Sequence, residues 1–288
     1  MADQVISIPL EKLHPFPNHP FEIRDDDAMR ETVESVKQYG VICPAIVRPL
    51  ENGDYEIIAG HRRHRACEIA GLDAMPVIVR ELDDDAATIL MVDSNLQREF
   101  ILPSERAKAY QMKMEAIKRQ AGRPAKGIRD QVGPNYFGRR SSEIIASEAG
   151  DSASQVKRFI RLTKLDPKLL QMVDDRKMGF TPAVEISYLK PEEQQMLLDT
   201  IDSEQATPSL SQAQRMKKLS QEGNLTDDAM LKIMMEQKKP DCWDVTLKGA
   251  TLRKYFPRSY TPQQIRQAIL NMLERAYQKR QQENAQTR

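Results

Sequence analysis

Residues 60–65 combine, at one short junction, the residue types that bind anions. They read Gly-His-Arg-Arg-His-Arg and directly follow the apolar run Ile57–Ala59. A helix that begins at His61 would present free backbone N–H groups and the positive end of its dipole. Its arginines add guanidinium groups, each of which can bind two phosphate oxygens at once. The junction therefore predicts a site for a polyanion, either the phosphate tail of a nucleotide or the backbone of a nucleic acid.

The surrounding pattern places this junction between a strand and a helix. Two of the expected strands flank the turn Asn52-Gly53-Asp54. The spacing of apolar residues and the presence of helix-capping residues indicate further strands and helices. We expect strands over 5–10, 45–49, 55–59 and 76–80, and helices over 26–39, over 61–70 and from the aspartates at 83–85 onward. Residues 1–97 are thus expected to form one compact α+β unit.

Charge is divided unevenly along the chain, although its net value is only +1. Residues 1–97 carry 9 Lys/Arg and 18 Asp/Glu, whereas residues 98–164 carry 15 and 7. A basic segment after an acidic one favours polyanion binding in the middle of the chain. A solvated basic helical surface would have the same composition.

The composition is typical of a soluble, helix-rich protein of two or three domains, with 40% hydrophobic and 30% charged residues in 288. No stretch approaches 18 apolar residues and the N-terminus has no secretion-signal pattern, so we expect no membrane partner and a cytoplasmic location. Cys43, Cys67 and Cys242 lack a Cys-x-x-Cys spacing, and the four histidines lack a ligand set. Both facts argue against disulfides and metal centres.

Two short helical patterns in the basic segment have the spacing of a helix-turn-helix. They cover residues 142–149 and 152–162. Ala146 would let the helices approach, Gly150 would permit the turn, and Val156 would pack the second helix onto the first. An ordinary αα-hairpin would show the same pattern, but the basic surroundings favour DNA.

The second of these helices supplies the candidate DNA contacts. A serine at its start would cap it, and its outward positions hold hydrogen-bonding side chains suited to base edges and phosphates. The candidate DNA-binding residues are Ser152, Ser154, Gln155, Lys157, Arg158 and Arg161.

The whole chain divides into three expected parts. A helix is predicted from Pro103 to about Gln120, a Gly/Pro-rich linker over 122–140, and a final helix from Thr261. We predict an α+β domain over 1–98, an all-α helix-turn-helix domain over 99–223 and a mostly helical segment over 224–288 that serves dimerisation or a partner.

Three stretches taken together resemble the ParB family of partition proteins. They are residues 40–48 (GVICPAIVR), 55–66 (YEIIAGHRRHRA) and 94–99 (SNLQRE), followed by the Pro-Ser-Glu-Arg-Ala helix start. Their order and spacing, with the helix-turn-helix downstream, extend the resemblance over roughly residues 5–220. It implies a ParB/sulfiredoxin-like N-terminal fold.

The resemblance also implies a function. Members of the family bind CTP with Mg²⁺, close as a homodimeric clamp on double-stranded DNA at a palindromic centromere-like site, and work with a ParA-type ATPase on the nucleoid. By this resemblance Asn95 lies beside the magnesium, and Arg98 lies near the phosphates. The nucleotide-binding residues would be Gly60, His61, Arg62, Arg63, Asn95 and Arg98.

Three positions depart from the family pattern. His61 and Ser94 stand where glutamate is usual, and Cys43 stands where glutamine is common. Ser94 removes a carboxylate expected beside the magnesium, and a hydroxyl is a weaker ligand for a hard cation. Asp93 is adjacent, but the next residue on a helix points about 100° away. Nucleotide binding is therefore expected, whereas magnesium dependence and a weak CTPase activity stay open.

Two other classes of function, an enzyme and a helical adaptor, fit the sequence less well, and a third stays open. A sulfiredoxin-like enzyme needs an activated thiolate in the phosphate turn, whereas Cys67 lies on the following helix. A helical adaptor leaves the arginine-rich turn unexplained. A transcriptional regulator or nucleoid-occlusion factor on the same scaffold stays open.

Overall fold

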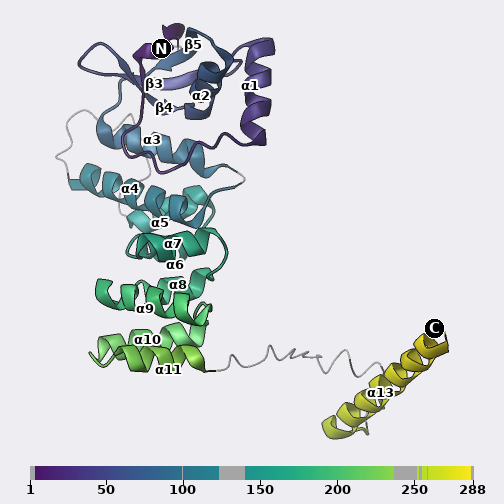
Figure 1. Ribbon diagram of the computed structural model, residues 1–288. Coiled ribbons are helices and arrows are strands. Elements are labelled where there is room, and N and C mark those ends of the chain that lie inside the picture. Colours follow the sequence, from purple (N-terminus) through teal and green to yellow (C-terminus); the bar gives the residue numbers. More distant parts are fainter. Residues whose placement is uncertain are drawn as a thin grey trace. The chain divides into compact units, whose positions relative to one another are not determined.

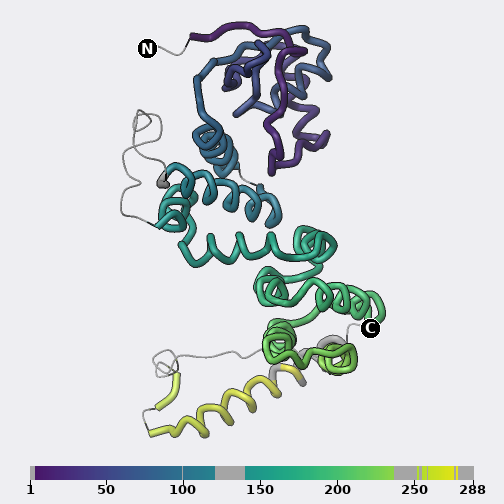
Figure 2. The backbone as a smooth tube through the Cα atoms, turned by 90° about the vertical axis from the view of Figure 1, so that its left-hand side faces the viewer, coloured from purple at the N-terminus to yellow at the C-terminus, as the bar shows by residue number. Residues whose placement is uncertain are grey.

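The computed structural model describes residues 4–98, 100–122, 140–236, 252, 255–257 and 259–286. They belong to two units, Met1–Glu236 and Gln237–Arg288, which are described separately. Figure 1 shows the elements as ribbons, and Figure 2 shows the backbone turned by 90°.

A five-stranded sheet forms the base of the described N-terminal region, in the order β1-β5-β3-β4-β2. β3 is antiparallel to β4 and parallel to β5, while β1 lies antiparallel beside β5. The strands are β1 (Val5–Pro9), β2 (Leu13–Pro15), β3 (Ala45–Pro49), β4 (Tyr55–Ala59) and β5 (Ala74–Val79), with a 3₁₀ turn η1 at Leu10–Lys12. The sequence did not predict β2, because three residues are too short to show a period and its parallel pairing with β4 is long-range.

Helices cover both faces of the sheet. α1 (Asp27–Tyr39) and α2 (His61–Ala70) pack on one face, and α3 (Asp84–Leu96) packs on the other. Alternation along β4 divides its side chains between these layers, since Ile57 joins the core under α1 and α2 whereas Ile58 joins the core under α3. α2 starts directly after β4, in which every residue except Tyr55 is buried.

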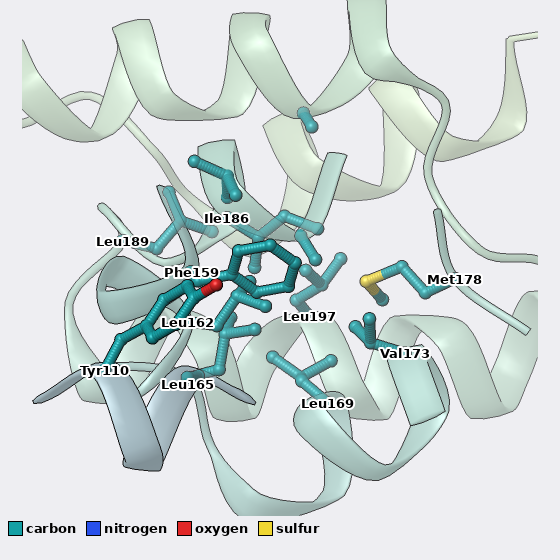
Figure 3. Close-up of a cluster of buried hydrophobic side chains, with 14 of the residues drawn as sticks. Tyr110, Phe159, Leu162, Leu165, Leu169, Val173, Met178, Ile186, Leu189 and Leu197 are labelled. Carbon is teal, nitrogen blue, oxygen red and sulfur yellow. The ribbon is translucent and has the colours of Figure 1, made fainter. Parts of the chain in front are cut away.

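All further described elements of the first unit are helical. They are α4 (Pro103–Gly122), α5 (Ser141–Ala149), α6 (Ala153–Leu162), α7 (Pro167–Asp174), α8 (Phe180–Ile186), α9 (Pro191–Glu204), α10 (Leu210–Gln221) and α11 (Asp227–Met235). One apolar cluster runs through them, and Figure 3 shows part of it, with Tyr110 of α4 beside Phe159 of α6. These two rings meet edge to face with centroids 5.8 Å apart, so α4 is packed tightly onto the second helix of the predicted helix-turn-helix.

The α+β domain followed by an all-α region confirms the predicted fold class. The helical region runs further than expected, because α11 packs on α9 and α10 beyond residue 223. Most of the expected linker at 122–140, and Cys242 in the last segment, lie outside the described residues.

In the second unit, α13 (Pro262–Gln286) begins where the sequence predicts a final helix, directly after Thr261. The Thr261 hydroxyl oxygen accepts a hydrogen bond from the Gln264 N–H at 3.3 Å and so caps the helix. Among the described helices of either unit, none is long and apolar enough to cross a bilayer.

Candidate nucleotide and DNA sites

Gly60 forms the turn between β4 and α2, and only glycine fits there. Its φ of +117° lies in the region that L side chains rarely adopt. A Cβ at this position would lie 2.7 Å from the Cβ of Ala45 on β3. The turn is therefore pressed against the sheet, and the first N–H groups of α2 are held in fixed positions.

The start of α2 lacks the side-chain cap that neighbouring helices have. Asp26 caps α1 by accepting from the Met29 N–H at 2.9 Å, and Asp83 caps α3 by accepting from the Ala86 N–H at 2.8 Å. Gly60 has no side chain to offer, and no side-chain cap is formed at α2. The free N–H groups and the dipole of α2 make this end of the helix an anion site.

Two guanidinium groups approach this helix start. Arg62 is 30% exposed and has a loose ion pair, 3.6 Å from Asp26. Arg98 follows the end of α3 and stacks over the ring of Phe21, 5.3 Å from its centroid. Burial lowers the pKa of Arg98; Glu105 opposes that shift, and the nearby positive charge of Arg62 adds to it. An anion between the two arginines would relieve this repulsion.

The other two arginines of the motif are already engaged. Arg63 donates to the carbonyl oxygens of Cys43 at 2.5 Å and Pro44 at 2.7 Å, and so fixes the loop before β3. It also borders an open cavity of about 380 Å³ between α1 and this loop. Arg65 pairs with Asp25 at 2.9 Å and with Glu68 at 3.2 Å on the surface. Arg62 and Arg98 are thus the better placed phosphate ligands.

His61 lies inside the protein, with 4% of its surface exposed. Its Nε2 accepts a hydrogen bond from the Phe16 N–H at 3.2 Å, and its ring packs against that of His19 with centroids 4.0 Å apart and an angle of 41° between the ring planes. Burial above all lowers its pKa to about 3, with smaller contributions from His19 and Arg98. The ring is therefore neutral near pH 7 and positions the loop that carries Phe16.

Asn95 and Ser94, at the end of α3, would offer magnesium only a weak set of ligands. Asn95 is buried and donates through its amide to the Met91 carbonyl at 2.8 Å. Ser94 donates to the same carbonyl at 2.9 Å. Asp93 pairs with Lys113 and does not replace the missing glutamate. In the part of the chain that the structure describes, no group of three His, Cys, Asp or Glu side chains could hold a metal ion.

The two described thiols do not form a catalytic site. Cys67 is fully buried on α2, and burial raises its pKa, which keeps the thiol protonated. Cys43 is exposed in the loop held by Arg63. These positions argue against the thiol enzyme considered from the sequence.

α5 and α6 have the local geometry of a helix-turn-helix. Gly150 ends α5 with a φ of +71°, and Ser152 caps α6 by accepting from the Gln155 N–H at 3.1 Å. Ala146 and Val156 are both buried between the helices, as their spacing predicts. Tyr110 of α4 donates its hydroxyl to Asp151 in the turn at 2.5 Å, which attaches the motif to α4.

The candidate DNA contacts on α6 fall into two groups. Ser152, Ser154 and Lys157 are exposed. The expectation that all candidates point outward is wrong for Arg158, which is half-buried, donates to Thr181 at 2.9 Å and lies over Phe180. It is also wrong for Arg161, which donates to the Ser187 carbonyl at 2.6 Å and lies over Tyr188.

The remaining Gln155 is half-buried at the start of α6, where its side-chain oxygen accepts from Arg158 at 3.4 Å. The sequence did not predict two further residues of the candidate nucleotide site, Phe21 and Glu105. Phe21 stacks under Arg98, and Glu105 accepts from the backbone N–H groups of Glu22 at 2.8 Å and Leu102 at 3.0 Å. Both are far in sequence from the turn at Gly60, so the sequence pattern does not show that either lies near it.

Comparison with known proteins defines the class. Residues 1–96 match the family model of the ParB N-terminal domain. The chromosome-partitioning protein Spo0J of Thermus thermophilus is 30% identical over 66% of this chain and 62% of its own length. A nucleoid occlusion protein of Listeria innocua is 31% identical over 68% of this chain and 62% of its own length. The chain thus spans 62% of the length of each of these two relatives.

Residues 1–96 thus match the ParB N-terminal domain, and the chain is similar to members of the ParB family over about two thirds of its length. Two crystal structures of C-terminally truncated ParB from Caulobacter crescentus are also similar. The complex with the centromeric parS site is 25% identical, covers 74% of this chain and 98% of its own, and has a TM-score of 0.45. The complex with CTP-gamma-S is 27% identical, covers 67% and 96%, and has a TM-score of 0.32. The resemblance drawn from the three sequence motifs is confirmed.

Proposed function

We propose that this chain is a DNA-binding partition protein controlled by CTP. The observation that carries the proposal is the uncapped start of α2 at Gly60, flanked by Arg62 and Arg98, in a ParB N-terminal domain that continues into a helix-turn-helix. It would recognise a palindromic centromere-like site as a homodimer, close on the DNA as a clamp, and work with a ParA-type ATPase on the nucleoid.

The nucleotide site is suited to a triphosphate. Backbone N–H groups of α2 and the guanidinium groups of Arg62 and Arg98 provide charge-assisted hydrogen bonds. Arg63 holds the Cys43–Pro44 loop against the same helix and orders the wall of the site. His61 stays neutral and fixes the loop at Phe16. CTP is the nucleotide that the family resemblance implies.

Magnesium is supported less well than the nucleotide. The Asn95 amide and the Ser94 hydroxyl offer neutral oxygens, and the nearby Asp93 is bound to Lys113. A hard cation prefers carboxylate and phosphate oxygens. We infer that any magnesium is held chiefly by the nucleotide's own phosphates, and that CTP hydrolysis is weak.

At the proposed DNA site, some side chains of α6 contact DNA and others hold α6 in place. Lys157 and Ser154 are free to approach phosphates and base edges, since both are exposed. Arg158 and Arg161 hold α6 against Thr181 and Ser187 and so orient the exposed side chains. A preformed orientation lowers the entropic cost of binding.

A second candidate function is nucleoid occlusion, favoured by the similarity to the Listeria innocua protein of that name. Mapping of bound chromosomal sites in cells separates the two. Partition requires sites gathered in one region of the replicon and a ParA-type partner that co-purifies. Occlusion of a whole nucleoid requires sites spread over it.

Calorimetric titration with CTP, ATP, GTP and UTP, with and without the bound DNA site, tests the nucleotide assignment. We expect CTP to bind at least about tenfold more tightly than the other three, which is a difference of about 1.4 kcal/mol. Equal affinity for all four, or no binding, would contradict it.

A further inference from the structure

A lysine side chain is enclosed where the N-terminal domain meets the helix-turn-helix. Lys113 lies on α4, and its side chain is 0% exposed. Its ammonium contacts the carboxylate of Asp93 on α3 and the carboxylate of Glu148 on α5. A buried ammonium is costly unless opposite charges and hydrogen bonds surround it. Burial of Lys113 therefore depends on how α3 and α5 are placed around α4.

The two partners of Lys113 belong to the two proposed sites. Asp93 directly precedes Ser94 and Asn95 in the last turns of α3. Glu148 lies in the last turn of α5, just before the turn of the helix-turn-helix. α3, α4 and α5 follow one another in Figure 1, and α4 packs against both of the others. One ammonium thus contacts the helix end of the nucleotide site and the first helix of the DNA site.

Other contacts hold the helix-turn-helix on α4 independently of Lys113. Asp151 in its turn accepts from Tyr110 at 2.5 Å and lies 3.7 Å from Arg106. Arg106 also lies over the ring of Phe159, 5.4 Å from its centroid. Replacement of Lys113 is therefore expected to leave the helix-turn-helix docked.

The two carboxylates compete for one positive charge. Asp93 on α3 and Glu148 on α5 both contact the single ammonium group of Lys113. A shift in the end of α3 weakens the Asp93 contact and leaves Lys113 with Glu148 alone. The position of α3 is in this way energetically linked to that of α5.

We propose that Lys113 is the positioning residue through which nucleotide binding at the end of α3 changes the DNA affinity of the helix-turn-helix. The inference rests on the proposed function of the two sites. A nucleotide that engages Asn95 and Arg98 displaces the last turn of α3 and with it Asp93. Lys113 transmits this displacement to α5 through Glu148. Coupling of this kind is reciprocal, so DNA changes nucleotide affinity by the same factor.

The test compares the dissociation constant for the cognate DNA site with and without saturating CTP. The ratio of the two constants, the coupling factor, is expected to differ from 1 by at least about fivefold in the wild type. In Lys113→Met it falls to within about twofold of 1, while each ligand alone binds within about threefold of wild type. Lys118→Met, the same change at an exposed position of α4, keeps the wild-type factor.

Asp93→Ala is the second variant, because it removes the side-chain oxygens that link Lys113 to α3 and leaves Lys113 paired with Glu148. It decides the question if Lys113→Met does not fold, and it is expected to lose coupling equally. A folded variant of either kind with the wild-type coupling factor would overturn the proposal, as would a wild-type factor of 1 when both ligands bind. Failure of the wild type to bind CTP or DNA at all would instead contradict the proposed function itself.

Discussion

Replacement of Gly60 by alanine is the most specific perturbation of the phosphate turn. The new Cβ would lie 2.7 Å from the Cβ of Ala45, whereas carbon atoms in contact lie about 3.5–4.0 Å apart. The start of α2 must therefore move by about 1 Å. Relief of such an overlap costs about 1–3 kcal/mol, and the φ of +117° adds about 1–3 kcal/mol of strain.

Gly71 provides a matched control at the other end of the same helix. Its φ is +74°, and a Cβ there would meet nothing within 4 Å. Gly71→Ala therefore lowers the free energy of unfolding by the backbone strain alone, about 1–2 kcal/mol. The difference between the two variants isolates the close approach of the turn to β3.

Urea denaturation and CTP titration measure the two consequences. We expect Gly60→Ala to lower the free energy of unfolding by about 2–6 kcal/mol and to weaken CTP binding at least about tenfold. Gly71→Ala keeps CTP affinity within about twofold. If Gly60→Ala is as mild as Gly71→Ala in both assays, the turn does not hold the phosphate ligands and the reasoning is refuted.

Three further predictions follow from the geometry. Because the pKa of His61 falls from 6.5 to about 3 on folding, its contribution to stability is complete above pH 6.5 and declines by about 1.4 kcal/mol per pH unit toward pH 3. Between pH 7 and pH 5 the free energy of unfolding should therefore fall by about 2 kcal/mol more in the wild type than in His61→Gln. Equal losses in the two proteins would contradict the buried neutral ring. Lys157→Ala should reduce the slope of log K for DNA binding against log [salt] by about 0.9 and change the free energy of unfolding by less than about 0.5 kcal/mol, whereas Arg158→Ala should lower the melting temperature. The reverse pattern would contradict the assignment of Lys157 to DNA contact and of Arg158 to support of α6. Ser94→Glu should raise magnesium-dependent CTP hydrolysis several-fold in a phosphate-release assay, and an unchanged rate would show that the missing carboxylate is not what limits turnover.

The sequence predicts those parts of the fold that depend on local signals. The strand at 55–59, the glycine at residue 60 and the helix from residue 61 are adjacent. An apolar run marks the strand, and the glycines at 60 and 71 mark the two ends of the helix. The two helices around Gly150 are marked in the same way. For these elements the physical cause lies within a few residues.

The partners of the site residues could not be predicted in this way. Arg158 and Arg161 lie on the outward side of a helical projection, yet α8 covers Arg158 and the residues directly after α8 cover Arg161. His61 has the polarity of a ligand, but the loop at Phe16 and the ring of His19 enclose it. Each of these outcomes depends on packing between segments more than 20 residues apart, or on a loop that no periodicity describes.

Titration of the wild-type and Arg62→Ala proteins with CTP tests the central claim most directly. Arg62 is partly exposed beside the start of α2, so its loss removes the proposed phosphate ligand without opening the core. We predict that Arg62→Ala binds CTP at least about tenfold more weakly, with unchanged melting temperature and unchanged DNA affinity in the absence of nucleotide. Wild-type CTP affinity in that variant would contradict the assignment of the turn as the nucleotide site.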